Sequence, residues 1–195
     1  MKSSSFTTQI EVSQTPEIVF KCLQDVSKWW GKEDFAGSGK ILNDEFTIKH
    51  GDIHYSKQKL IEVVPNEKIV WLVTDSTLDW LQRDKHEWTN TKMIFDIIAK
   101  GDKTLLQFTH EGLVPAKECY AMCRQGWSMI ISEWLFHFIH SCKKEFIKLF
   151  IINSPGSIII FITILISSFV KVKAGCFCKI VKTHRSVIPS MKKSC

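Results

Sequence analysis

The sequence predicts an α+β fold, in which a curved antiparallel sheet of about six strands packs against one long C-terminal helix. Two observations carry this prediction. Segments of alternating apolar and polar residues follow one another through the middle of the chain, separated by the short polar turns 51–52, 65–67 and 101–102. After them comes one stretch, residues 115–141, whose apolar residues recur every three or four positions. This order describes an antiparallel meander and not a series of alternating βαβ units.

A strand and a short helical pair open the chain. The strand is predicted over residues 6–12, where every second residue lies on the same face. Thr15 followed by Pro16 is typical of a helix start. Residues 27–31 predict a second short helix or turn that carries two tryptophans, and the Gly- and Ser-containing residues 34–44 predict a loop.

Five more strands complete the predicted sheet. They lie at residues 45–50, 54–64, 68–74, 91–100 and 103–110. The connection over residues 75–90 is much longer than the others and contains Trp80 and Trp88. Loops of this length in compact domains are commonly lids or binding loops. Gly112 and Pro115 then end the last strand and begin the helix.

The long helix carries two apolar rows. The larger row consists of Tyr120, Cys123, Trp127, Ile131, Trp134 and Phe138. A row of this size needs a broad cover, which the curved sheet provides, and a helix held by a sheet often leaves a cavity between the two. The second row, Met122, Met129 and Phe136, lies on roughly the opposite side of the helix. It predicts a surface for a protein partner, with coverage by strands or by the C-terminal residues as the alternative.

Composition excludes one class of function and indicates a compartment. The net charge of +6 arises from residues 146–195, which hold eight Lys or Arg and no Asp or Glu, so residues 1–145 carry a net charge of −2. We therefore expect no binding of nucleic acid by this part of the chain. The seven Cys are odd in number, and the N-terminus has no apolar stretch typical of a signal peptide. These features predict a cytoplasmic protein with free thiols.

Four segments of the chain resemble one known superfamily. They are FTTQIEVSQTPEIVFKCLQDVSKWWG (6–31), GDIHYSKQKLIEVVPNEKIVWLVTD (51–75), DKHEWTNTKMIFDI (84–97) and FTHEGLVPAKECYAMCRQGW (108–127). In this order they are similar to the SRPBCC superfamily, and within it to the branch of homologues of the activator of heat-shock-protein ATPase, over residues 5–141. The resemblance implies the START-like, helix-grip fold, which hosts many functions. It implies a small soluble domain without an assigned reaction.

The resemblance and the aromatic content together predict that a small hydrophobic ligand binds between sheet and helix. The residues expected to line this site are Trp30, Trp71, Trp88, Phe95, Phe108, His110, Trp127 and Ile131. His110 ends the inward row of its strand, so its imidazole would orient the ligand. The alternative is ordinary core packing, which is favoured for Trp71 and Trp134.

The sequence contains no nucleophile motif, phosphate-binding loop or paired carboxylates at helical spacing. Cys119 and Cys123 stand four residues apart, but no second pair of metal ligands accompanies them. We therefore expect no catalytic residue, metal or cofactor, and a binding protein more than an enzyme. Two alternatives stay open: a chaperone-associated interaction protein, and a cyclase- or hydrolase-like enzyme that would need a second polar group beside His110.

Residues 146–195 differ from the preceding domain, residues 1–145. Residues 146–170 are almost all apolar, but Lys148 and the Asn-Ser-Pro-Gly sequence interrupt them. The uninterrupted part, residues 157–170, is shorter than the roughly 20 residues of a spanning helix. Translation past the natural end of the domain, through a frameshift or a lost stop codon, is the favoured interpretation, because the family pattern ends abruptly here. A membrane anchor flanked by the basic residues 171–193 is the second, and a disordered extension is the third.

Overall fold

The computed structural model describes residues 5–31, 35–142, 147–154 and 157–164. The chain divides into two units, residues 1–144 and 145–195. In the second unit, β8 (Ile147–Ser154) and β9 (Ser157–Ile164) form an antiparallel pair. The predicted basic flank, residues 171–193, lies outside the described residues. Among the residues described, no helix has the length and hydropathy needed to cross a membrane.

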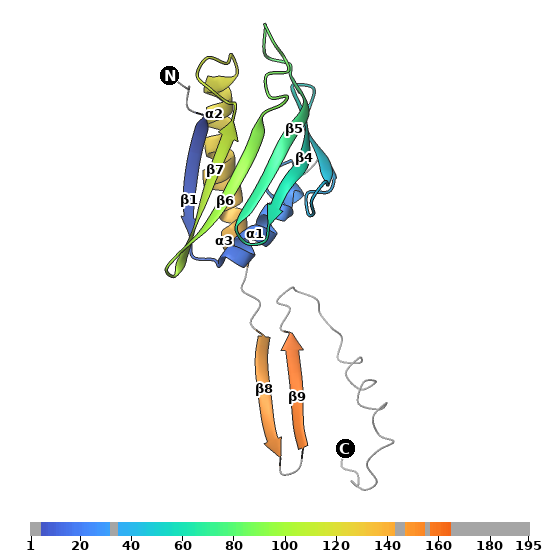
Figure 1. Cartoon of the computed structure of the whole chain (residues 1–195), viewed down its shortest axis with the longest axis vertical. Helices are drawn as coiled ribbons and strands as arrows, with labels where there is room; N and C mark the ends of the chain where they lie inside the picture. The colour runs from blue at the N-terminus through green and yellow to red at the C-terminus, as the bar shows by residue number, and fades with distance from the viewer. Residues whose placement is uncertain (1–4, 32–34, 143–146, 155–156, 165–195) are drawn as a thin grey trace. The chain divides into compact units, whose positions relative to one another are not determined.

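The first unit is built on a seven-stranded antiparallel sheet with the order β1-β7-β6-β5-β4-β3-β2 (Figure 1). The strands are β1 (Phe6–Val12), β2 (Phe35–Gly37), β3 (Glu45–His50), β4 (His54–Val64), β5 (Lys68–Leu78), β6 (Lys92–Lys100) and β7 (Lys103–Glu111). The predicted fold class is confirmed. The sheet has one strand more than expected, because β2, predicted as part of a loop, pairs with β3.

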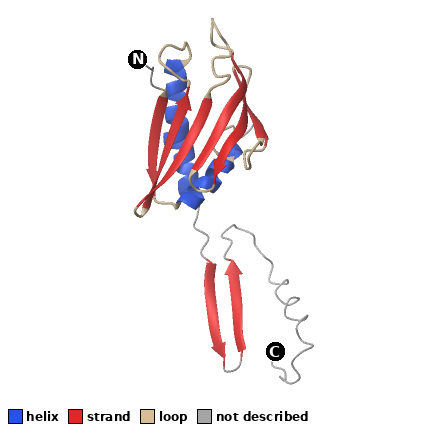
Figure 2. Ribbon diagram, viewed as in Figure 1, coloured by secondary structure: helices blue, strands red, loops and turns tan. Residues whose placement is uncertain are grey.

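The helices of the first unit all lie on one face of this sheet (Figure 2). They are α1 (Pro16–Gln24), the 3-10 turn η1 (Val26–Lys28), α2 (Tyr120–Met129), the π-helical η2 (Ile130–Leu135) and α3 (Phe136–Ser141). The last three follow one another without a break and form the predicted long helix. Its first regular turn begins at Tyr120 and not at Pro115, because residues 115–119 form turns that pack against the long loop.

A π turn decides which side of the long helix is buried. The buried residues follow one another at intervals of four: Cys119, Cys123, Trp127, Ile131, Leu135 and Ile139. In a regular α-helix a spacing of four drifts around the axis, because one turn takes 3.6 residues. The wider turn of η2 offsets this drift. The expectation that Trp134 is buried was therefore wrong: Trp134 is 43% exposed, and Leu135 occupies the buried position instead.

One hydrogen-bond chain connects the helix, the sheet and the long loop. Trp127 Nε1 donates to Nδ1 of His110 on β7 at 3.0 Å. Because an indole nitrogen only donates, Nδ1 is the acceptor and Nε2 carries the proton. His110 Nε2 then donates to Thr91 Oγ1 at 2.9 Å, and Thr91 Oγ1 donates to the carbonyl of Trp88. The chain therefore fixes a single neutral tautomer of a fully buried histidine.

Replacing Trp127 with Phe keeps most of the ring but removes the donor to His110. We expect Trp127→Phe to lower the free energy of unfolding by about 1–3 kcal/mol, because His110 Nδ1 is left buried without a partner. Urea unfolding measures the change. The matched control is Trp134→Phe, which changes an exposed indole and should shift stability by less than about 0.5 kcal/mol. Equal effects of the two substitutions would contradict the role given to this bond.

The buried histidines make stability depend on pH. Burial lowers the pKa of His110 to about 3, with a smaller contribution from Lys117, and burial together with His50 lowers the pKa of His54 to about 4. In the unfolded chain a histidine titrates near 6.5. Below that pH the unfolded state therefore binds more protons than the folded state, and the free energy of unfolding falls as the pH falls. The slope is up to about 1.4 kcal/mol per pH unit for each histidine.

This dependence is measured by urea unfolding between about pH 7 and about pH 5, above the range in which most carboxylates titrate. His110→Gln keeps a polar side chain but cannot take up a proton. We expect its slope against pH to be clearly smaller than that of the wild-type chain, whatever its overall stability. An unchanged slope would show that His110 does not contribute.

Candidate functional site

The eight residues predicted to line the ligand site come together in the interior between sheet and helix. All eight are buried. Trp71 and Phe95 come from β5 and β6, Phe108 and His110 come from β7, and Trp127 and Ile131 come from the long helix. Trp30 follows η1, and Trp88 lies in the loop between β5 and β6.

Their rings contact one another. The ring centroids of Phe108 and Trp127 are 4.5 Å apart, those of Trp71 and Phe95 are 4.7 Å apart, and those of Trp30 and Trp127 are 4.9 Å apart. Trp88 stacks on Trp127 at 5.7 Å. The walls of the predicted site therefore touch, and a ligand would need one of these side chains to move.

The loop of residues 79–91 contributes side chains to the interior although it is not a strand of the sheet. β5 pairs with β6 only from Lys68 to Leu72, although β5 continues to Leu78. Beyond this point the loop takes the place of strand pairing: the N–H of Val73 donates to the carbonyl of Thr91, and Ser76 Oγ lies 2.9 Å from Thr89 Oγ1. Two tryptophans of the loop, Trp80 and Trp88, therefore reach the interior where β5 and β6 no longer pair.

Two carboxylates fasten the loop to the start of the long helix. The carboxylate of Glu87 accepts the N–H groups of Glu118 and Cys119 at 2.9 and 2.8 Å. In return the carboxylate of Glu118 accepts the N–H groups of Gln82 and Arg83 at 3.0 and 3.1 Å. We call these contacts the loop clamps. Burial alone would raise the pKa of Glu87, but hydrogen bonds from Cys119 and Glu118 hold that pKa below its ordinary value.

His110 is engaged on both ring nitrogens, by Trp127 and by Thr91. Its imidazole is neutral, since burial lowers its pKa to about 3. A general acid or base needs a free nitrogen and a pKa near the working pH. In this arrangement His110 positions Trp127 and Thr91, and the second polar group that an enzyme would require beside it is the hydroxyl of Thr91, which is bonded to a backbone carbonyl.

Three polar residues of β4 also face the interior, and the sequence analysis missed them. His54, Ser56 and Gln58, which we call the polar row, are 7%, 0% and 0% exposed. His54 Nε2 lies 3.1 Å from Ser56 Oγ. The sequence of β4 does not show which of its faces is buried, because the outward residues between these three, Tyr55 and Lys57, also carry polar groups. The available signal was the unusual presence of polar residues on both faces of a strand with neighbours on each side.

His54 connects the interior with the surface. Its ring lies 5.0 Å from that of Trp88 and 6.2 Å from that of Trp80. It also lines a surface depression of about 240 Å³ beside the β3–β4 turn, together with Lys49, Asp52 and Tyr55. The polar row therefore begins where the interior comes closest to this depression.

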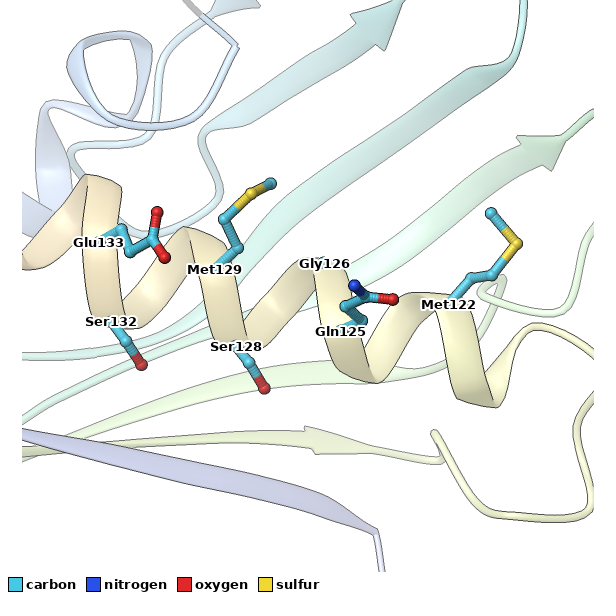
Figure 3. A pocket seen from close by; sticks show the side chains of 7 residues that line it. All are labelled: Met122, Gln125, Gly126, Ser128, Met129, Ser132 and Glu133. Atoms are coloured by element: carbon cyan, nitrogen blue, oxygen red, sulfur yellow. The ribbon is translucent and has the colours of Figure 1, made fainter.

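The long helix carries a second feature on its exposed side. Met122 and Met129 are 61% and 41% exposed and line a groove of about 560 Å³ with Gln125, Gly126, Ser128, Ser132 and Glu133. Figure 3 shows the two methionines projecting from the same side of the helix. Phe136, the third member of the predicted row, is half-buried against the core and does not line this groove. The π turn between Met129 and Phe136 rotates Phe136 away from the other two.

Cys119 and Cys123 lie at the buried side of the helix start. Cys123 Sγ accepts the N–H of Trp88 Nε1 at 3.3 Å, so this thiol anchors the loop indole. Within the described part of the chain, no three His, Cys, Asp or Glu side chains are grouped so that they could hold a metal ion.

Comparison with known proteins agrees with the geometry. Residues 14–135 match the family described as activator of Hsp90 ATPase homolog 1-like protein. A search of curated protein sequences finds no match.

Among solved structures, the Aha1 dimer from Colwellia psychrerythraea is 17% identical, with a TM-score of 0.54 over 66% of this chain and 91% of that chain. Protein MLL2253 from Mesorhizobium loti is 16% identical, with a TM-score of 0.55 over 71% and 99%. CalU16 from Micromonospora echinospora is 14% identical, with a TM-score of 0.52 over 71% and 78%.

At these identities the solved structures establish the fold alone, which is the helix-grip fold. The family match covers more than half of the sequence and the same elements that build the sheet and the long helix. The chain therefore belongs to the family of activator of Hsp90 ATPase homolog 1-like proteins.

Proposed function

We propose that this protein is a non-enzymatic binding module for a small, flat hydrophobic ligand, held between the sheet and the long helix. The ligand takes the place of the loop indoles Trp80 and Trp88 and stacks on Trp30 and Trp127. The observation that carries the proposal is that Trp88 fills the centre of the aromatic cluster but belongs to a loop, where β5 and β6 no longer pair.

The contacts that hold Trp88 support the proposal that its side chain is a plug, which can leave the interior. Its ring packs on Trp127, His54 and His110, and its only side-chain hydrogen bond is the weak one to Cys123 Sγ. Its backbone is held by Thr91, which donates to the Trp88 carbonyl, and by the loop clamps, which are polar contacts near the surface. Breaking such contacts costs less than breaking strand pairs buried in a sheet, because water replaces the lost hydrogen bonds.

A ligand of similar shape would compensate for the withdrawn indole. Fully burying a large aromatic side chain stabilises a protein by about 1.5–3 kcal/mol, and a flat ligand restores that burial. Stacking on Trp30 and Trp127 adds an orientation preference, since aromatic rings pack offset or edge to face. The ligand must therefore be apolar over most of its surface and about as flat as an indole.

The neutral fluorescent probe N-phenyl-1-naphthylamine tests this proposal. We expect saturable binding to the wild-type chain and at least about tenfold tighter binding to Trp88→Ala, because the variant has no indole to withdraw and a buried indole is worth more than 1.4 kcal/mol. Fluorescence titration gives both dissociation constants. Trp134→Ala removes an exposed indole of the long helix, and this variant should bind the probe as the wild type does.

A second variant leaves the plug in place and weakens only a clamp. Glu87→Gln replaces one acceptor oxygen with an amide group that faces the N–H of Glu118 or of Cys119. Association of the probe, followed by stopped flow, should become faster. If Trp88→Ala unfolds cooperatively but binds the probe no better than the wild type, and Glu87→Gln leaves the association rate unchanged, the proposed plug is wrong.

A second candidate function is favoured by the exposed methionine groove. Met122 and Met129 present flexible apolar side chains beside a groove, a surface typical of protein partners. The family to which the chain belongs is described by likeness to an activator of Hsp90 ATPase. A heat-shock ATPase is therefore the partner that this alternative proposes.

Under this alternative the immobilised chain should retain Hsp90, and Met129→Asp should abolish retention, because a carboxylate in the groove would be desolvated without a partner. Ile98→Asp, an exposed apolar residue on β6 outside the groove, is the matched control and should retain Hsp90. Retention that survives Met129→Asp would exclude this surface.

A further inference from the structure

The polar row is costly for a hydrophobic core. β4 is a central strand, with β3 on one side and β5 on the other, and its inward positions are filled by His54, Ser56 and Gln58 before Leu60. Directly opposite Ser56, the neighbouring strand places a fourth polar residue, Ser76, also with no exposure. Burying such groups is unfavourable even when they are hydrogen-bonded to one another. Packing of the helix alone gives no reason for polar residues at these positions.

The row is internally bonded and uncharged. With its amide oriented so that Oε1 accepts from Ser56 Oγ at 2.6 Å, Gln58 donates to the carbonyls of Ser56 and Phe46. Ser56 Oγ then accepts from His54 Nε2 at 3.1 Å. His54 is neutral, since burial lowers its pKa to about 4. The row therefore presents a neutral imidazole at its outer end and fixed dipoles further in.

Three indoles that reach the interior supply donors that have no acceptor. Among the residues described, the buried nitrogens of Trp29, Trp71 and Trp80 make no hydrogen bond. Trp80 stacks on His54, and Trp29 and Trp71 both stack on Trp30, whose ring meets His54 edge-on. A buried N–H without a partner costs about 1–3 kcal/mol, so three of them in one interior need an explanation.

The same interior offers nothing to a charged ligand. The buried polar residues of the described chain are His54, Ser56, Gln58, Ser76, Thr91, Thr104 and His110. None of them is an Asp, Glu, Lys or Arg. A carboxylate or ammonium group in this space would have no counter-charge, and burying an unpaired ion costs far more than burying a neutral polar group.

We infer that the ligand is an uncharged molecule with a flat apolar body and at least one hydrogen-bond-accepting oxygen, such as a carbonyl, placed to accept from the unpaired indole N–H groups of Trp29 and Trp71. The inference rests on the proposed function and names the class of ligand for the same site. Trp80 leaves the site with the loop, so Trp29 and Trp71 supply the donors. The polar row lines the site as an uncharged surface whose own donors are already used.

Three probes that share one ring system separate the proposed function from the inference about the class of ligand. Naphthalene has the flat body alone, 2-acetylnaphthalene adds a neutral carbonyl, and 2-naphthoate adds a negative charge. Isothermal titration calorimetry of the full chain near neutral pH gives their dissociation constants. We expect 2-acetylnaphthalene to bind about fivefold tighter than naphthalene, because one hydrogen bond is gained. 2-Naphthoate should bind at least about tenfold weaker than naphthalene.

Two variants locate the recognition. Trp71→Phe and Trp29→Phe each keep an aromatic ring and remove one unpaired N–H. In each, the preference for 2-acetylnaphthalene over naphthalene, taken as the ratio of the two dissociation constants, should shrink. Trp134→Phe, an indole exposed on the far side of the helix, should leave the preference intact.

The outcomes are distinct. Binding of naphthalene and 2-acetylnaphthalene with equal affinity, or tightest binding of 2-naphthoate, overturns the inference and leaves the proposed function standing. A preference for the carbonyl that survives both Trp71→Phe and Trp29→Phe also overturns it, since recognition then lies elsewhere. Binding of none of the three overturns the proposed function and, with it, this inference.

Discussion

The hydrogen bond from Trp127 to His110 is the constraint on which the arrangement of this domain depends. A neutral imidazole has one acceptor and one donor, and here the acceptor faces the helix while the donor faces Thr91 at the end of the long loop. Helix, sheet and loop are therefore joined through a single ring that lies in the dry interior. Moving the helix away from the sheet, or Thr91 away from His110, leaves a buried polar atom without its partner. This explains why an interior made mostly of non-directional aromatic contacts has one defined geometry.

Much of the fold was predictable because its signals are local. Alternation placed the strands, turn residues separated them, and the apolar spacing after Pro115 gave the long helix. The errors came from features without a local signal. Phe35–Gly37 is a strand only because β3 provides a pairing edge. Trp134 was assigned to the buried side because the prediction assumed regular α-helical turns, whereas η2 is π-helical. The strict four-residue interval from Cys119 to Ile139 was visible in the sequence and indicated a helix wound more loosely than 3.6 residues per turn.

The candidate site was predicted in part for a similar reason. The apolar lining residues follow from strand alternation and helix spacing, so all eight lie together in the interior. Sequence spacing could not show that the walls touch, or that a loop residue occupies the centre. Nor could it identify the polar row, because β4 has polar residues on both faces and therefore shows no hydrophobic alternation there. The inward residues are His54, Ser56 and Gln58, and the outward ones are Tyr55, Lys57 and Lys59. Which polar residues are buried is a tertiary property, set by the strands and the helix that cover them.

The strands and the long helix form a frame, whereas the loop of residues 79–91 only places side chains inside it. This difference has an evolutionary consequence. Within the frame, the register between β6 and β7 is continuous along their whole length. Part of the centre of the interior is filled by Trp88, which belongs to the segment of residues 79–91 and not to a strand. Insertions and substitutions in such a segment disturb no strand register. A descendant of this chain can therefore acquire a differently shaped interior through changes confined to one loop, while the frame around it is inherited intact.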